Sequence, residues 1–178
     1  MSEVSSVALE RARRVRLMIF DVDGVLTDGR LWYGPAGEAL KSFHALDGHG
    51  IKMLAQSGVL PAILSGRRSP AVTQRAAELG IAHVLQGIDD KHSAYAALLA
   101  QLGVEAQATG YVGDDVVDLP VLTRCGFACA PREAPLEVRQ RVHYVCESPA
   151  GGGAAREICE LLMRAQGSLD AALARYLA

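Results

Sequence analysis

The sequence predicts an α/β fold built on a doubly wound parallel β-sheet. Short apolar runs recur along the chain, and segments of helical length and spacing separate them. Several of these runs end in acidic or hydroxyl residues next to glycine. Strands that alternate with helices form parallel sheets covered on both faces, because each crossover returns the chain to the same edge.

The first strand is expected at residues 15–20, a continuous apolar run of the kind buried on both faces of a sheet. A β-hairpin is expected at residues 29–44, where Gly-Pro-Ala-Gly divides two short runs rich in strand-forming residues. The remaining strands are predicted at residues 59–66, 81–87, 108–115, 127–130 and 143–146.

Helices are expected between these strands, at residues 47–58, 69–80, 89–103, 116–126 and 154–166. The second has the clearest boundaries. Ser69 suits the N-cap, Pro70 suits the first turn and Gly80 lies just beyond the end. The alternation extends through most of the chain, so the sequence predicts one Rossmann-like domain.

Composition narrows the class of protein. The chain has 178 residues, of which 50% are hydrophobic, and a net charge of −2. No basic tract points to nucleic acid, and no apolar run approaches the roughly 20 residues that span a bilayer. The four cysteines lack metal or disulfide spacing, and the N-terminus does not resemble a signal peptide. We therefore expect a cytoplasmic protein with reduced thiols.

Polar residues gather where the predicted strands end. Ligands of open parallel sheets bind at this edge. Clustered carboxylates are unfavourable unless a cation joins them, and oxygen ligands favour Mg²⁺. A carboxylate is also a competent nucleophile toward phosphorus, and hydroxyl and ammonium groups bind phosphoryl oxygens. The pattern predicts phosphoryl transfer by residues of these loops, namely Asp21, Asp23, Ser65, Lys91, Asp114 and Asp115.

The segments DVDGVLTDG, LSGR, DK and GDDVVD, in this order, resemble the four motifs of the haloacid dehalogenase superfamily. The resemblance implies that Asp21 is the nucleophile and that Asp23 acts as general acid and then base. It further implies that Asp21, the backbone carbonyl of Asp23 and Asp114 hold Mg²⁺. Ser65 and Lys91 would bind the phosphoryl group. The implied supporting residues are Gly66, Asp115 and Asp118.

Simpler interpretations exist for some of these residues. Asp115 and Asp118 also suit the start of a helix, where acids are favoured by the dipole. Ser65 also suits a helix cap, and Lys91 alone would be an ordinary solvated lysine. His49 and His92 have no partner at metal-ligand spacing.

No cap domain fits between Asp21 and Ser65 or between Ser65 and Lys91, because predicted elements fill both intervals. This capless layout is similar to the family of 3-deoxy-D-manno-octulosonate 8-phosphate phosphatases, which serve lipopolysaccharide biosynthesis. The similarity implies a small anionic sugar-acid phosphate as substrate. Besides Asp23 and Lys91, the implied substrate contacts are a loop of His44, Ala45, Leu46, Asp47 and Gly48, and the cations Lys52, Arg67 and Arg75.

The same resemblance implies a homotetramer in which the hairpin and the C-terminal tail help to close a neighbour's site. The expected organisation is an N-terminal extension at 1–14, a phosphatase domain at 15–166 with a hairpin flap at 29–44, and a tail at 167–178. Two alternatives remain. One is a different substrate, such as a nonulosonate 9-phosphate. The other is a non-enzymatic phospho-receiver domain, which the order of the motifs disfavours because the third strand, 81–87, ends without an aspartate.

Overall fold

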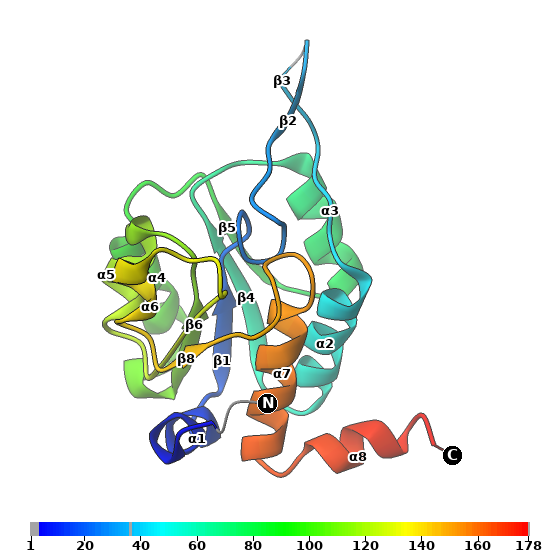
Figure 1. Cartoon of the computed structure of the whole chain (residues 1–178), viewed down its shortest axis with the longest axis vertical. Coiled ribbons are helices and arrows are strands. Elements are labelled where there is room, and N and C mark those ends of the chain that lie inside the picture. The colour runs from blue at the N-terminus through cyan, green and yellow to red at the C-terminus, as the bar shows by residue number, and fades with distance from the viewer. Residues whose placement is uncertain (1–3, 36, 178) are drawn as a thin grey trace.

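A computed structural model describes residues 4–35 and 37–177 (Figure 1). Within these residues, six parallel strands form one sheet in the order β5-β4-β1-β6-β7-β8. The chain winds outward from β1 to one side and then to the other, which confirms the predicted doubly wound sheet. The strands are β1 (Leu17–Phe20), β4 (Leu60–Ser65), β5 (His83–Gln86), β6 (Thr109–Val112), β7 (Phe127–Ala130) and β8 (Tyr144–Val145).

Strand β1 lies at the centre, and alternate side chains enter two different cores. Met18 and Phe20 contact one core, whereas Leu17 and Ile19 contact the other. This is the period of two expected of a strand buried on both faces. Figure 1 shows helices on both sides of the sheet.

The helices divide between the two cores. Helices on the first face are α1 (Ser6–Arg13), α2 (Ala45–Gln56), α3 (Pro70–Leu79), α7 (Ala154–Ala165) and α8 (Leu169–Ala174). Helices on the second face are α4 (Lys91–Leu102), α5 (Leu119–Leu122) and α6 (Leu136–Arg139). Two 3₁₀ turns, η1 (Ala106–Ala108) and η2 (Val116–Asp118), flank β6.

The predicted boundaries hold best where local signals are strong. Helix α3 starts at Pro70 after Ser69, and Gly80 ends it in the left-handed conformation with φ 72°. The expected helix at 116–126 is instead a 3₁₀ turn followed by the short helix α5. The structure also has α1, α6 and α8, which the sequence pattern did not predict.

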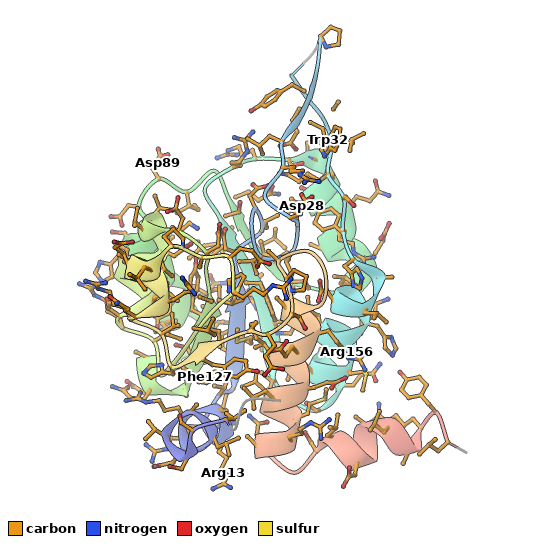
Figure 2. All side chains as sticks on the ribbon, viewed as in Figure 1. Arg13, Asp28, Trp32, Asp89, Phe127 and Arg156 are labelled. Carbon is orange, nitrogen blue, oxygen red and sulfur yellow. The ribbon has the colours of Figure 1, made fainter. Side chains whose placement is uncertain are left out.

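The predicted hairpin is present as an antiparallel pair, β2 (Trp32–Gly34) and β3 (Gly37–Leu40). It projects from the body of the molecule, with Trp32 on its stem, whereas Phe127 lies within the body (Figures 1 and 2). Its apolar side chains are largely exposed, since Trp32 and Tyr33 retain 51% and 63% of their accessible surface. Ala36, between the two strands in the sequence, lies outside the described residues.

The two ends of the chain pack on the first face. Arg11 in α1 donates a hydrogen bond to the carbonyl of Gly126 at 2.8 Å. Beyond α8, Arg175 donates to the Gln56 side chain at 2.9 Å, and the Tyr176 ring contacts His49. The division into an extension, a domain and a tail stays a prediction. None of the helices described is long and apolar enough to cross a membrane.

The predicted state of the cysteines is confirmed. All four are buried and free of disulfides, namely Cys125, Cys129, Cys146 and Cys159. Burial raises the pKa of the Cys129 thiol well above its usual value, which disfavours the reactive thiolate. These thiols therefore act as small core side chains.

Candidate active site

The loops after β1, β4 and β6 meet the start of α4 at one edge of the sheet and enclose a cavity of about 280 Å³. This is the edge at which ligands of doubly wound sheets bind. The cavity brings together all the predicted catalytic and metal-binding residues. Its lining consists of Asp21, Asp23, Gly29, Leu31, Ser65, Gly66, Arg67, Lys91, Asp114, Asp115 and Val117.

Asp21 follows the last residue of β1 and is buried at the cavity floor. Its backbone N–H donates to the carbonyl of Val112 at 3.0 Å, which ties it to the adjacent strand β6. Lys91 Nζ lies 3.1 Å from its carboxylate. Burial, together with the negative charge of Asp118, raises the pKa of Asp21 to about 7 despite this lysine.

Asp118 orients the groups around Asp21. One carboxylate oxygen accepts hydrogen bonds from Lys91 and from the Tyr111 hydroxyl, both at 2.6 Å. The other accepts from the backbone N–H groups of Asp114 at 3.1 Å and Asp115 at 3.2 Å. Asp118 also completes a capping box with Asp115. The helix-start interpretation therefore describes part of its role, and the contact with Lys91 adds the rest.

Three carboxylates, those of Asp21, Asp114 and Asp118, each place an oxygen within 4.8 Å of the others. Burial and the negative charge of Asp21 raise the pKa of Asp114 to about 7. Gly24 permits this crowding, because a Cβ there would overlap the Asp114 carboxylate and its φ is +82°. An all-oxygen, negatively charged set of this kind fits a hard divalent cation.

The hydrogen bonds of Asp118 decide which side chains would hold such a cation. Both of its oxygens already accept from protein donors, whereas Asp21 and Asp114 line the cavity. The predicted contribution of Asp23 to the cation site is its backbone carbonyl, and its side chain is predicted to act as general acid and base. The Asp23 side chain belongs to an ion-pair network at the base of the hairpin.

This network was not predicted from the sequence. The Asp23 carboxylate contacts the ammonium of Lys41 and lies 3.8 Å from Arg67 Nε. Lys41 also lies 3.1 Å from Glu38, and Arg67 donates to the hydroxyl of Tyr33 at 2.8 Å. The local sequence carries no signal for Lys41, because a lysine at the end of a two-stranded ribbon ordinarily faces solvent.

Ser65 is the last residue of β4 and is buried at the cavity wall. Its hydroxyl accepts the backbone N–H of Arg67 at 3.3 Å, an arrangement that turns the chain after the strand. Gly66 is exposed in this turn. Ser65 and Gly66 therefore face the same cavity as Asp21 and Lys91.

Comparison with known proteins decides the family. The chain is 45% identical to the 3-deoxy-D-manno-octulosonate 8-phosphate phosphatase of Haemophilus influenzae over 158 residues, which are 89% of this chain and 88% of that protein. The chain belongs to this phosphatase family. A model of haloacid dehalogenase-like hydrolases also matches residues 80–158. Both resemblances expected from the motifs are confirmed, and the protein is a phosphoric monoester hydrolase.

Solved structures of similar chains have the same fold. A probable phosphatase from Pseudomonas syringae superposes with a TM-score of 0.95 at 46% identity, covering 98% of this chain and 99% of that one. The phosphatase from Moraxella catarrhalis, solved in complex with magnesium, phosphate and KDO, superposes with a TM-score of 0.92 at 39% identity, covering 95% of this chain and 97% of that one.

Membership of this phosphatase family excludes the receiver-domain alternative. The structure gives a physical reason as well. A receiver domain places its phospho-accepting aspartate at the end of the third strand, whereas the third strand of this sheet, β5, ends in Gln86. The Gln86 side chain accepts a hydrogen bond from the backbone N–H of Ser69 and donates one to the Thr73 hydroxyl.

The predicted substrate loop of this phosphatase is not a loop. His44 is the N-cap of α2, and Ala45 to Gly48 form its first turn. Asp47 is buried and accepts from the backbone N–H groups of Gly153 at 3.2 Å and Arg156 at 2.8 Å. It thereby caps α7, on which Arg156 is labelled in Figure 2. Helix α2 starts at Ala45, two residues before the predicted start at Asp47.

Other predicted contacts lie outside the cavity lining. Ala45 and Leu46 are exposed, as is Lys52 on the next turns of α2. Arg75 on α3 packs over Gly48, where a Cβ would overlap its guanidinium, and it pairs with Glu78 at 3.3 Å. Among the three predicted cations of the phosphatase, Arg67 alone lines the cavity around Asp21.

Proposed function

We propose that this chain hydrolyses 3-deoxy-D-manno-octulosonate 8-phosphate to the free sugar acid and phosphate, with Mg²⁺ and through an aspartyl-phosphate, in the synthesis of a lipopolysaccharide precursor. One observation carries the proposal. Buried Asp21 lies 3.1 Å from Lys91 and shares its cavity with Asp114. The Moraxella catarrhalis relative, which has the same fold, binds magnesium, phosphate and KDO.

In the first step, a carboxylate oxygen of Asp21 attacks phosphorus and the bond from phosphorus to the sugar oxygen breaks. Asp23 gives its proton to that leaving oxygen. Lys91 and Ser65 hold the phosphoryl oxygens, and the charge of Lys91 offsets the negative charge that develops. Asp118 keeps Lys91 aimed at this place through its 2.6 Å contact.

In the second step, a water molecule attacks the phosphorus of the aspartyl-phosphate and gives its proton to the Asp23 carboxylate. The bond between phosphorus and Asp21 breaks, which restores both side chains and releases phosphate. A bound Mg²⁺ would neutralise charge between the carboxylates and the phosphate. Asp21, Asp114 and the Asp23 carbonyl would hold it.

Substrate recognition by the cations remains part of the proposal. Arginine pairs well with carboxylates, and a sugar-acid phosphate carries a carboxylate far from its phosphate. Of the three predicted substrate cations, Arg67 is the one that lines the cavity, with its Nε 3.8 Å from the Asp23 carboxylate. We propose that Arg75, Lys52 and the segment His44–Gly48, which lie outside the cavity lining, contact the sugar-acid end of the substrate. A homotetramer is proposed on the resemblance alone, and a cytoplasmic location is proposed on the sequence features given above.

The test is phosphate release from 3-deoxy-D-manno-octulosonate 8-phosphate, from a nonulosonate 9-phosphate and from common sugar phosphates, with Mg²⁺ and with a chelator. We expect Mg²⁺-dependent preference for the first, and no turnover by a folded Asp21→Asn variant. Preference for the nonulosonate would retain the mechanism and replace the substrate. Normal turnover by Asp21→Asn would refute the mechanism.

A further inference from the structure

Lys41 is buried between two carboxylates at the base of the hairpin. It directly follows β3, and its side chain retains 2% of its accessible surface. Its ammonium contacts Asp23 and lies 3.1 Å from Glu38. Removing one partner of a buried ion pair is costly, so this arrangement holds all three side chains in one geometry.

The contact distinguishes the two oxygens of Asp23. Asp23 Oδ1 accepts a hydrogen bond from the Lys41 ammonium. Oδ2 is buried and has no hydrogen-bond partner within residues 4–35 and 37–177, and Arg67 Nε lies 3.8 Å from it. One oxygen is therefore fixed by the hairpin, and the other is left for a proton or a substrate atom.

We propose that Lys41 is a positioning residue that holds Asp23 so that its Oδ2 exchanges the proton in both steps of the reaction. This inference rests on the function proposed above. Lys41 does not touch the reacting phosphorus and acts only through Asp23. Glu38 in turn holds Lys41, since it contacts both Lys41 and Arg67.

The role predicts different effects on the two chemical steps. With p-nitrophenyl phosphate, the first step transfers the phosphoryl group to Asp21 and expels nitrophenolate with the bonding electron pair, so no proton is needed. The second step still needs Asp23 to accept a proton from water. Misplacing Asp23 by about 1 Å should slow the second step about 100-fold while the first continues.

The experiment compares Lys41→Met with wild type by rapid mixing with p-nitrophenyl phosphate and Mg²⁺. We expect Lys41→Met to release close to one nitrophenolate per site in a burst, followed by turnover about 100-fold slower. Acid quenching and intact-mass measurement should then detect phosphorylated enzyme. Lys41→Arg should restore much of the turnover, since it retains a cation. A lower rate without burst or phosphoenzyme would overturn the proposal.

Two further variants keep the test decisive. Glu38→Gln leaves Lys41 in place but loosens it, so a smaller burst is expected even where Lys41→Met does not fold. Arg14→Met removes an exposed cation paired with Glu10 and should behave as wild type. An inactive wild type would refute the proposed function itself, whereas an active wild type matched by Lys41→Met and Glu38→Gln would refute only the role of Lys41.

Discussion

The ammonium of Lys91 and the carboxylate of Asp118 lie 2.6 Å apart, and neither side chain exposes more than 5% of its surface. Lys91 contacts Asp21 at the longer distance of 3.1 Å. Asp118 therefore anchors the lysine, and the lysine faces Asp21 from a fixed position.

Replacing Asp118 by Asn should lower both stability and activity. The change removes the charge that balances buried Lys91, which costs about 3 kcal/mol of unfolding free energy. The lysine would also lose its orientation, and we expect kcat to fall at least tenfold. Urea unfolding and steady-state kinetics measure the two effects. Asp170→Asn, at an exposed position, is the control. An Asp118→Asn variant as stable and active as this control would contradict the assignment of Asp118 as the anchor of Lys91.

Magnesium should stabilise the protein more at pH 8 than at pH 6. Burial raises the pKa of both Asp21 and Asp114 to about 7. A carboxyl with a raised pKa favours folding at low pH, and this contribution is lost as the pH rises through 7. A cation needs both groups deprotonated, so its affinity should rise over the same interval.

Thermal unfolding with and without Mg²⁺ at the two pH values measures this effect. At 100 times its dissociation constant, a bound ion stabilises by about 2.7 kcal/mol. Asp114→Ala should lose most of the shift at pH 8. An equal shift in that variant, or at both pH values, would place the cation elsewhere.

His143 should make the fold sensitive to acid. The backbone N–H of Ala128 donates to its Nδ1 at 2.8 Å, and burial lowers the pKa of this imidazole. Because the pKa of His143 is lower in the folded state, its contribution to stability is complete above the pKa of about 6.5 in the unfolded state. This contribution is lost as the pH falls through the pKa of the folded state.

Urea unfolding at pH 7.5 and pH 5 tests this prediction. His143→Asn retains an acceptor without a charge, so its stability should fall less between the two pH values than that of wild type. His92→Asn, an exposed histidine, should leave the wild-type difference unchanged. Identical pH dependence in all three proteins would show that His143 has no such role.

Replacing Arg75 by Met should raise KM for the sugar-acid phosphate about tenfold or more, because one charge-assisted hydrogen bond is worth about 1.5–3 kcal/mol. The kinetics of p-nitrophenyl phosphate, which has no carboxylate, should change little. Arg68→Met is a matched control, since Arg68 packs against Gly87 instead. Equal effects of Arg75→Met on both substrates would show that Arg75 does not contact the sugar acid.

Local patterns were enough to predict the sheet and the residues of its functional edge. The apolar run before Asp21 and the cap and stop signals around α3 are each encoded by a few adjacent residues. Their meeting point follows from the right-handed crossovers alone. Asp21, Ser65, Lys91 and Asp114 therefore line one cavity, as the strand ends predicted.

The remainder depends on contacts between distant segments. The carboxylate of Asp47 caps a helix that begins over 100 residues later, with a separation of 106 positions to Gly153. No local pattern distinguishes this use of Asp47 from a substrate contact. The local pattern predicted a helix from residue 47, and the family resemblance implied a substrate loop at His44–Gly48, which the structure shows as the N-cap and first turn of α2. Lys41 is hidden for a similar reason, since only the folded hairpin places it against Asp23.

The position of β1 between β4 and β6 has a consequence for how the chain acquires its structure during synthesis. Leu17 pairs with Leu60 on one side and with Thr109 on the other. One edge of the central strand therefore remains open until the ribosome has released residues well beyond 109, and long-range parallel pairing of this kind is slow. Nascent or truncated chains that end before β6 expose an apolar strand edge, which is a template for aggregation and a binding site for chaperones.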